Sequence, residues 1–152
     1  MKLSEEQVRG IIQLARKRKE PVNLQGRNLS GLGLLTADLA SANLRQANMT
    51  DINLAQANLS GADLSGATLV QASLLEADLH GANLSQTNLL QANLGHANLQ
   101  GADLRNSYLG GANLSRANLS EANLQGAKYN AYTQWPVGFD PQVAGARFRL
   151  SS

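Results

Sequence analysis

Leucine recurs at every fifth residue of this chain from Leu24 to Leu124, with Met49 as the one substitution, which gives 21 consecutive pentads. In most pentads the residue two positions before the leucine is alanine, and in 17 of the 21 the residue directly before it is Asn or Asp. An α-helix repeats its faces about every 3.6 residues and a strand every 2, so neither accommodates this period. The chain must therefore change direction once in each pentad.

The pattern also indicates where the chain turns. It places Ala and Leu on one inward side and leaves three outward positions in each pentad. Glycine, which tolerates the positive φ of a tight turn, ends eight pentads: Gly26, Gly31, Gly61, Gly66, Gly81, Gly101, Gly111 and Gly126. Four such corners would close a square coil and three a triangular one, and the period alone allows both. Coils stacked by main-chain hydrogen bonds rise about 4.8 Å each, so about five coils form a rod roughly 25 Å long.

The run ADLASANLRQANM at residues 37–49, with the similar runs that follow it through Leu124, resembles the pentapeptide-repeat family. The resemblance covers about 105 of the 152 residues. It implies an all-β solenoid, a right-handed quadrilateral β-helix, and this handedness agrees with the general preference of parallel crossovers. The segment YNAYTQWPVGFDPQVAGA, which begins at Tyr129, resembles the irregular closing segment of many cyanobacterial members and so implies a cyanobacterial source.

The N-terminal residues predict a helix that caps the coils. Ser4 and Gln7 are spaced as a capping box. An apolar stripe at helical spacing follows, formed by Val8, Ile11, Ile12 and Ala15. We expect a helix over about residues 5–19, ended by Pro21, with this stripe on the first coil. Arg27 falls at an inward pentad position, so its side chain must leave the coil at the edge.

The C-terminal segment holds five of the six aromatic residues of the chain: Tyr129, Tyr132, Trp135, Phe139 and Phe148. Tyr129 falls where the next leucine would be. We interpret the segment as a lid over the last coil, whose apolar end would otherwise be exposed, and a partner-binding patch is the alternative. The chain then forms one compact domain with three parts: a capping helix over 1–20, a β-helix over 21–127, and a cap and tail over 128–152.

The sequence carries little that would support catalysis. His80 and His96 occupy outward positions on different faces and cannot share a metal ion. No metal-ligand spacing, phosphate loop or supported Ser-His-Asp order is present. We therefore expect no enzymatic activity, no cofactor and no metal site. In a coil of four pentads, outward residues 20 positions apart stack along the rod and form a ladder. One ladder places His96 between an acid and a base, and we interpret it as a salt-linked surface: Thr36, Gln56, Glu76, His96 and Arg116.

Charge is distributed unevenly along the chain. Residues 1–20 carry six basic and three acidic side chains, whereas residues 21–127 carry four arginines and seven acids. The basic run formed by Arg16, Lys17, Arg18 and Lys19 could contact phosphate or an anionic membrane surface. We interpret it instead as the favourable placement of cations at a helix C-terminus. No aromatic residues are interleaved with it, so nucleic acid is not a favoured partner.

Cysteine is absent, and no apolar run approaches the length of a transmembrane helix. We expect a soluble, cytoplasmic protein that is a monomer or a weak oligomer.

Two functions remain: a scaffold that docks another protein on its rigid faces, and mimicry of DNA, which family members use to inhibit DNA gyrase. Duplex DNA presents one charge per about 1.7 Å, so a mimic about 25 Å long needs roughly fifteen negative charges. The seven acids of residues 21–127 are offset by four arginines, which favours the scaffold.

Stacking the pentads four to a coil identifies a candidate docking surface. Val70 and Leu90 become outward neighbours one coil apart, and Leu75 lies around the corner from Val70. Gln71 and Gln91 flank the apolar pair. Scattered exposed apolar residues are normal on protein surfaces, which is the alternative interpretation, but this group is the best candidate for a docking surface in the sequence. Trp135, in the aromatic segment, is a further candidate for contact with a partner protein.

Overall fold

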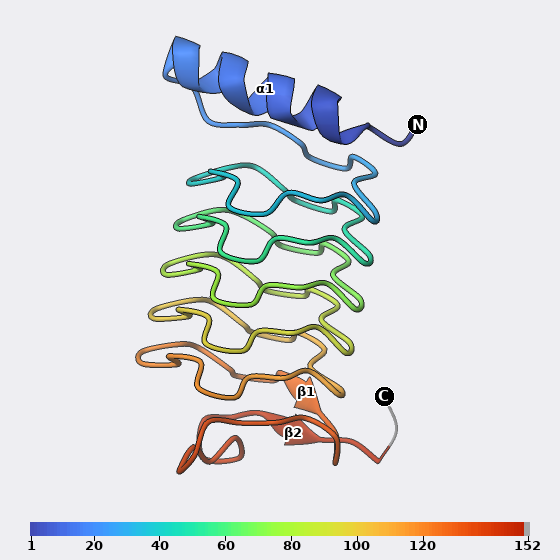
Figure 1. Cartoon of the computed structure of the whole chain (residues 1–152). Helices are drawn as coiled ribbons and strands as arrows, with labels where there is room; N and C mark the ends of the chain where they lie inside the picture. Colours follow the sequence, from blue (N-terminus) through green and yellow to red (C-terminus); the bar gives the residue numbers. More distant parts are fainter. Residues whose placement is uncertain (151–152) are drawn as a thin grey trace.

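The computed structural model describes residues 1–150, and Figure 1 shows a rod of stacked coils with a helix across one end. The helix, α1, spans Glu5–Arg18. Two short strands, β1 (Lys128–Tyr129) and β2 (Arg147–Phe148), pair in parallel at the other end of the rod. Within residues 1–150, no helix has the length and apolar character needed to cross a membrane.

Each coil contains four pentads. Parallel bridges join residues 20 positions apart, as in Asn53 to Ser73 and Ser73 to Asn93. On this face the Leu74 N–H donates to the Asn93 carbonyl at 2.7 Å, and the Asn93 N–H donates to the Ala72 carbonyl at 2.9 Å. A triangular coil would join residues three pentads apart, so the bridges exclude it.

The leucines and alanines of the pentads form the core. The pentad leucines and Met49 are at most 9% exposed. Burial of each leucine is worth about 1.5–3 kcal/mol, so the columns stabilise the stack. Thr87 and Ser107 replace alanine without leaving a buried hydroxyl unsatisfied, because Thr87 Oγ1 donates to the Leu84 carbonyl at 2.7 Å and Ser107 Oγ to the Leu104 carbonyl at 2.8 Å.

The residue at every corner from Gly26 to Gly126 has a positive φ. Eight of these residues are glycine, as the sequence indicates, and the other thirteen are of other types with φ between 55° and 61°. Across the corner at Glu76, the Ala77 N–H donates to the Leu74 carbonyl at 3.0 Å. This i to i+3 bond, with positive φ at the third residue, is that of a type II turn. Glycine therefore suits the corner but is not required there.

Helix α1 closes the first coil (Figure 1). The predicted capping box is confirmed, because Ser4 Oγ accepts from the Gln7 N–H at 3.1 Å and Gln7 Oε1 accepts from the Ser4 N–H at 2.8 Å. Lys19 ends the helix in a left-handed conformation. The predicted apolar stripe faces the core, with two residues buried and two packed at its border: Val8, Ile12, Ile11 and Ala15.

Two arginines of α1 fasten the helix to the first coil. Arg9 Nη2 donates to the Gly33 carbonyl at 3.0 Å, and Arg16 Nη2 lies 2.6 Å from Asp38 Oδ2. Arg27 is exposed at the edge of this coil, as its inward pentad position led us to expect. Side-chain contacts as well as apolar burial therefore hold the cap in place.

Four of the five C-terminal aromatic rings pack together over the last coil. The ring of Tyr129 meets Trp135 edge-on at 5.4 Å and Phe148 at 5.6 Å between centroids. Trp135 in turn stacks on Phe139 at 5.3 Å. Tyr132 lies outside the group and is 79% exposed. The rings thus cover the apolar end of the leucine columns.

Candidate docking surface

Val70 and Leu90 stack in one ladder on the side of the rod. The Gln71 N–H donates to the Leu90 carbonyl at 2.9 Å, which places the two coils in register at this corner. Gln71 Nε2 also donates to Gln91 Oε1 at 3.1 Å. The two apolar side chains are half-buried, and the two glutamines are exposed. The structure therefore brings together four of the six candidate residues.

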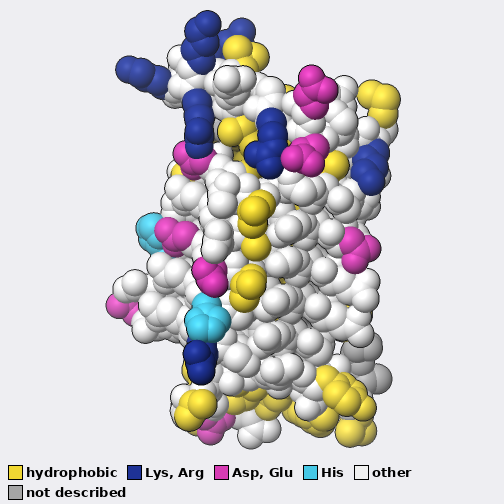
Figure 2. All heavy atoms as spheres, in the orientation of Figure 1, with side chains coloured by type: hydrophobic (Ala, Val, Ile, Leu, Met, Phe, Trp, Pro, Cys, Tyr) yellow, Lys and Arg dark blue, Asp and Glu magenta, His cyan; other side chains and the backbone are white. Residues whose placement is uncertain are grey.

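Leu75 occupies the next corner of the coil and stacks in a different ladder. Leu35, two coils away in this ladder, is 48% exposed, and Gly95 follows Leu75 one coil further on. A Cβ on Gly95 would stand 3.2 Å from Leu75 Cδ1, so the leucine covers the glycine. Figure 2 shows a short row of apolar side chains along the rod beside a row of acidic, histidine and basic side chains.

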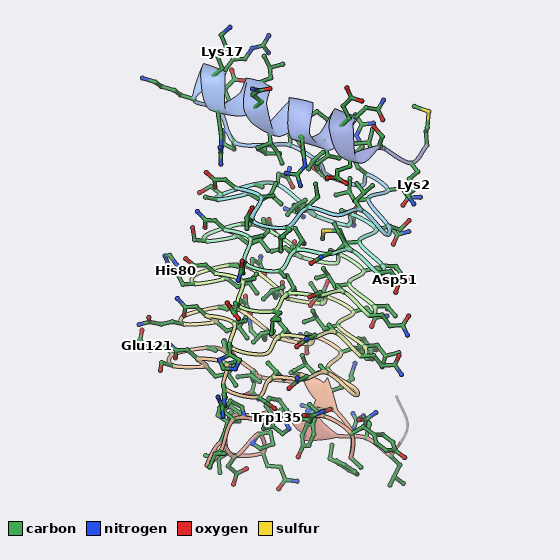
Figure 3. The ribbon with its side chains drawn as sticks, viewed as in Figure 1. Lys2, Lys17, Asp51, His80, Glu121 and Trp135 are labelled. Carbon is green, nitrogen blue, oxygen red and sulfur yellow. The ribbon has the colours of Figure 1, made fainter. Side chains whose placement is uncertain are left out.

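Trp135 does not join the surface formed by Val70 and Leu90. Figure 3 shows it at the C-terminal end of the rod, near β1. Its ring packs between Tyr129 and Phe139. Among the side chains of residues 1–150, its Nε1 is the buried polar atom that lacks a hydrogen-bond partner. These contacts give Trp135 a packing role in the lid, and its contact with a partner protein stays a prediction.

Each Asp that precedes a pentad leucine contacts a basic or histidine side chain. The four pairs and their N to O distances are Arg16 and Asp38 at 2.6 Å, Arg45 and Asp63 at 3.8 Å, His80 and Asp78 at 2.9 Å, and Arg105 and Asp103 at 2.7 Å. The hydrogen bonds from Arg105 lower the pKa of Asp103, although burial raises it. Burial raises the pKa of Asp78 too, but hydrogen bonds from the His80 side chain and backbone outweigh it and lower the pKa. These pairs engage four of the seven acids in residues 21–127, three of them with arginine.

The ladder that contains His96 is not salt-linked, so that interpretation was wrong. Gln56 Nε2 donates to Glu76 Oε2 at 3.1 Å. Within residues 1–150, however, no ion pair within 4.0 Å involves His96 or Arg116. Exposed pairs gain little free energy from association, so nothing holds these long side chains together.

A second cluster, which we did not predict, lies where the coils meet β1. Lys128 Nζ donates to Tyr108 Oη at 3.1 Å and lies 4.3 Å from the centroid of the Tyr108 ring. Arg147 pairs with Lys128 across the two strands. The sequence contains one signal for this cluster, because Tyr108 stands where the repeat uses Asn or Asp. The described chain, residues 1–150, has no group of three or more His, Cys, Asp or Glu side chains arranged to hold a metal ion.

The model of the family described as pentapeptide repeats matches this chain in eight copies, over residues 22–56, 37–74, 57–95, 72–111 and 97–128. The chain therefore belongs to the pentapeptide-repeat family, whose known structures are right-handed quadrilateral β-helices. Members of this family are generally non-enzymatic structural or regulatory proteins.

Two solved structures of cyanobacterial pentapeptide-repeat proteins are similar to this one. Rfr23 from Cyanothece 51142 is 33% identical, with a TM-score of 0.74, and the match covers 84% of this chain and 98% of Rfr23. HetL from Nostoc sp. strain PCC 7120, a protein involved in heterocyst differentiation regulation, is 31% identical, with a TM-score of 0.52. That match covers 73% of this chain and 66% of HetL. No curated protein matches the sequence significantly.

Proposed function

We propose that this protein is a non-enzymatic scaffold that docks another protein on the side of the rod formed by Val70 and Leu90. The observation that carries the proposal is the stacking of these two half-buried apolar side chains, in register, between exposed glutamines. Leu75 and Leu35 add a second apolar edge at the next corner. The structural and regulatory character of the family supports the same class of function.

The rod suits docking because its surface is held in place before a partner binds. Each face of a coil is hydrogen-bonded to the coils on both sides, and the corners repeat one turn geometry. A preformed surface loses little conformational entropy on association, so more of the contact free energy appears as affinity. An extended partner segment can therefore bind without reshaping the scaffold.

The test replaces both apolar residues with charge. The Val70→Glu/Leu90→Glu double variant should lose capture of the main partner from native extract, because two carboxylates would be desolvated without partners in an apolar contact. The matched control is Ser65→Glu/Ser85→Glu, which adds the same charge at equivalent pentad positions on another face. Circular dichroism melts should be similar for all three proteins. If the double variant retains capture and an unchanged melt, the surface is the wrong one.

Mimicry of DNA is the weaker candidate because the rod carries too little negative charge. The four Asp residues that directly precede a pentad leucine contact cations or histidine. Three acids of the coils then remain outside such pairs within residues 1–150: Asp51, Glu76 and Glu121. A mimic of this length needs roughly fifteen negative charges.

A further inference from the structure

The pentad at residues 107–111 departs from the repeat at the outward position next to its leucine. In all 17 pentads that carry Asn or Asp there, the side-chain oxygen accepts the N–H of the residue two positions on, as Asn93 does from Gly95 at 3.0 Å. Tyr108 cannot form this bond to Gly110. The chain gives up a structural hydrogen bond and places there an aromatic ring that is 44% exposed. Departures of this kind are expected at functional positions.

A small hollow of about 30 Å³ lies beside Tyr108. Leu90 and Gly110 occupy the same ladder, and because Gly110 has no side chain, the lower side of Leu90 stays uncovered. The hollow is lined by Leu90, Tyr108, Gly110, Lys128, Tyr129, Asn130 and Arg149. Its floor is apolar, and it has room for the methyl end of one apolar side chain. The apolar surface that begins at Val70 therefore continues into a recess.

Three cations surround this recess on the strand side. Lys128 and Arg149 line it, and Arg147 lies next to Lys128 in the parallel register of β1 and β2. In the part of the chain from residue 1 to 150, none of these cations forms an ion pair within 4.0 Å. The one acid between residues 128 and 150, Asp140, accepts the N–H groups of Gln142 and Val143. The local positive charge is therefore not balanced within residues 1–150.

We propose that this recess binds an acidic segment of the partner protein, with the methyl end of one apolar side chain of the segment in the hollow and its carboxylates on Lys128, Arg147 and Arg149. The proposal rests on the docking function above and names the chemistry of the partner. Charge complementarity selects an acidic chain, because charge-assisted hydrogen bonds from Lys and Arg to carboxylates are about twice as strong as neutral ones. A second copy of this end would bring like charges together and is disfavoured.

The experiment measures fluorescence anisotropy of labelled synthetic peptides with the full-length protein. The acidic probe has the sequence Gly-Ser-Leu-Asp-Glu-Asp-Gly. One control peptide replaces its Leu with Gly, and the other replaces its acids with Asn and Gln. We expect the acidic probe to bind at least about tenfold more tightly than either control peptide. Equal binding of the three peptides would overturn the proposal.

Two variants locate the binding on the protein. Lys128→Glu/Arg149→Glu should weaken the acidic probe at least about tenfold, while Lys17→Glu/Arg18→Glu, with the same change of charge at the other end, should leave it unchanged. Tyr108→Asn restores the repeat and should fold normally but bind the probe more weakly. Unchanged binding in Lys128→Glu/Arg149→Glu, or an equal loss in the control variant, would overturn the assignment.

The outcome is separable from that of the docking test. One outcome is that Val70→Glu/Leu90→Glu abolishes partner capture while the acidic probe binds wild type and Lys128→Glu/Arg149→Glu equally. In that case the proposed docking function is retained and this inference fails. Sedimentation with phosphatidylcholine vesicles, with and without phosphatidylglycerol, tests the remaining source of negative charge. Binding to the anionic vesicles that is lost in Lys128→Glu/Arg149→Glu, without binding of the acidic probe, would identify a lipid surface and overturn the peptide assignment.

Discussion

Single residues of the repeat have separate structural roles. The role of the outward Asn or Asp is the one that the sequence pattern reveals least. In the pentads that carry Asn or Asp, its side-chain oxygen accepts a backbone N–H near the corner, as Asn93 does from Gly95. Asn occupies this position in thirteen pentads and Asp in four, and Asn is the neutral option. The structure adds that either residue supplies the acceptor, so the position is set first by the turn and then by charge.

Removing this acceptor should be measurable at one position. Asn93→Ala leaves the Gly95 N–H without its partner and should lower the free energy of unfolding by about 0.5–1.5 kcal/mol. Asn93→Asp keeps the oxygen and serves as the matched control. Chemical denaturation followed by circular dichroism compares the three proteins. A loss of the same size in Asn93→Asp would show that the amide, rather than the acceptor oxygen, matters.

The pairing of Asp103 with Arg105 predicts a dependence of stability on pH. The pKa of Asp103 in the folded chain lies below its ordinary value of 3.8, chiefly through the hydrogen bond from Arg105. A depressed folded pKa contributes stability above the unfolded pKa, and this contribution is lost as the pH falls through the folded pKa. The stability difference between wild type and Asp103→Asn should therefore be largest near neutral pH and shrink below about pH 4. Denaturant melts across this range measure it, and a difference that grows with acid would contradict the pairing.

The coil is the structural element of this protein, and it depends on its neighbours for stability. A single coil exposes its Leu and Ala edges above and below, so burial requires stacking. Different elements cover the two ends of the stack, α1 at one end and the aromatic lid at the other. Both protect main-chain edges that would otherwise pair with other molecules.

The inward leucines should carry most of this stability. Leu94→Ala in a middle coil should cost about 2–5 kcal/mol through lost transfer free energy and the cavity left behind. Gln91→Ala, three residues away on an outward corner, loses its contact with Gln71 and should have a mild effect. Thermal melts of the two variants test the register. Similar midpoints for Leu94→Ala and Gln91→Ala would contradict it.

The sequence predicted the coil and α1 because both follow a period. The Leu columns, the capping box at Ser4 and the helix bounds within one residue could all be read from spacing. The C-terminal end has no period to read. There Asn113 bridges to Gln134, one residue beyond the regular separation, and β2 forms from a segment without a strand pattern. The cluster of Tyr108, Lys128 and Arg149 depends on that irregular end, which is why it escaped sequence reasoning.

The whole molecule has an excess of positive charge at both ends and a small excess of negative charge between them. Residues 1–20 hold six basic and three acidic side chains, and residues 128–152 hold three basic and one acidic. Between them, Asp38, Asp63 and Asp103 form ion pairs with arginines, and Asp78 contacts His80. This distribution is opposite to that of a uniformly anionic rod.

The charge distribution predicts how the protein behaves in nucleic-acid assays. Purified protein should neither inhibit gyrase supercoiling at low micromolar concentration nor bind duplex DNA tightly at physiological salt, because its charge is too sparse and too mixed. Supercoiling gels and DNA titrations at two salt concentrations provide the measurement. Potent inhibition of gyrase would favour mimicry over the scaffold.

The separation of 20 residues between bridged positions also fixes how such a molecule can change length. Gain or loss of one whole coil moves α1 and the aromatic lid apart or together by about 4.8 Å and returns every face to the same direction. Gain or loss of a single pentad would instead rotate one end by a quarter turn about the rod axis relative to the other. The distance between the two ends can therefore change in steps of one coil while their relative orientation is kept.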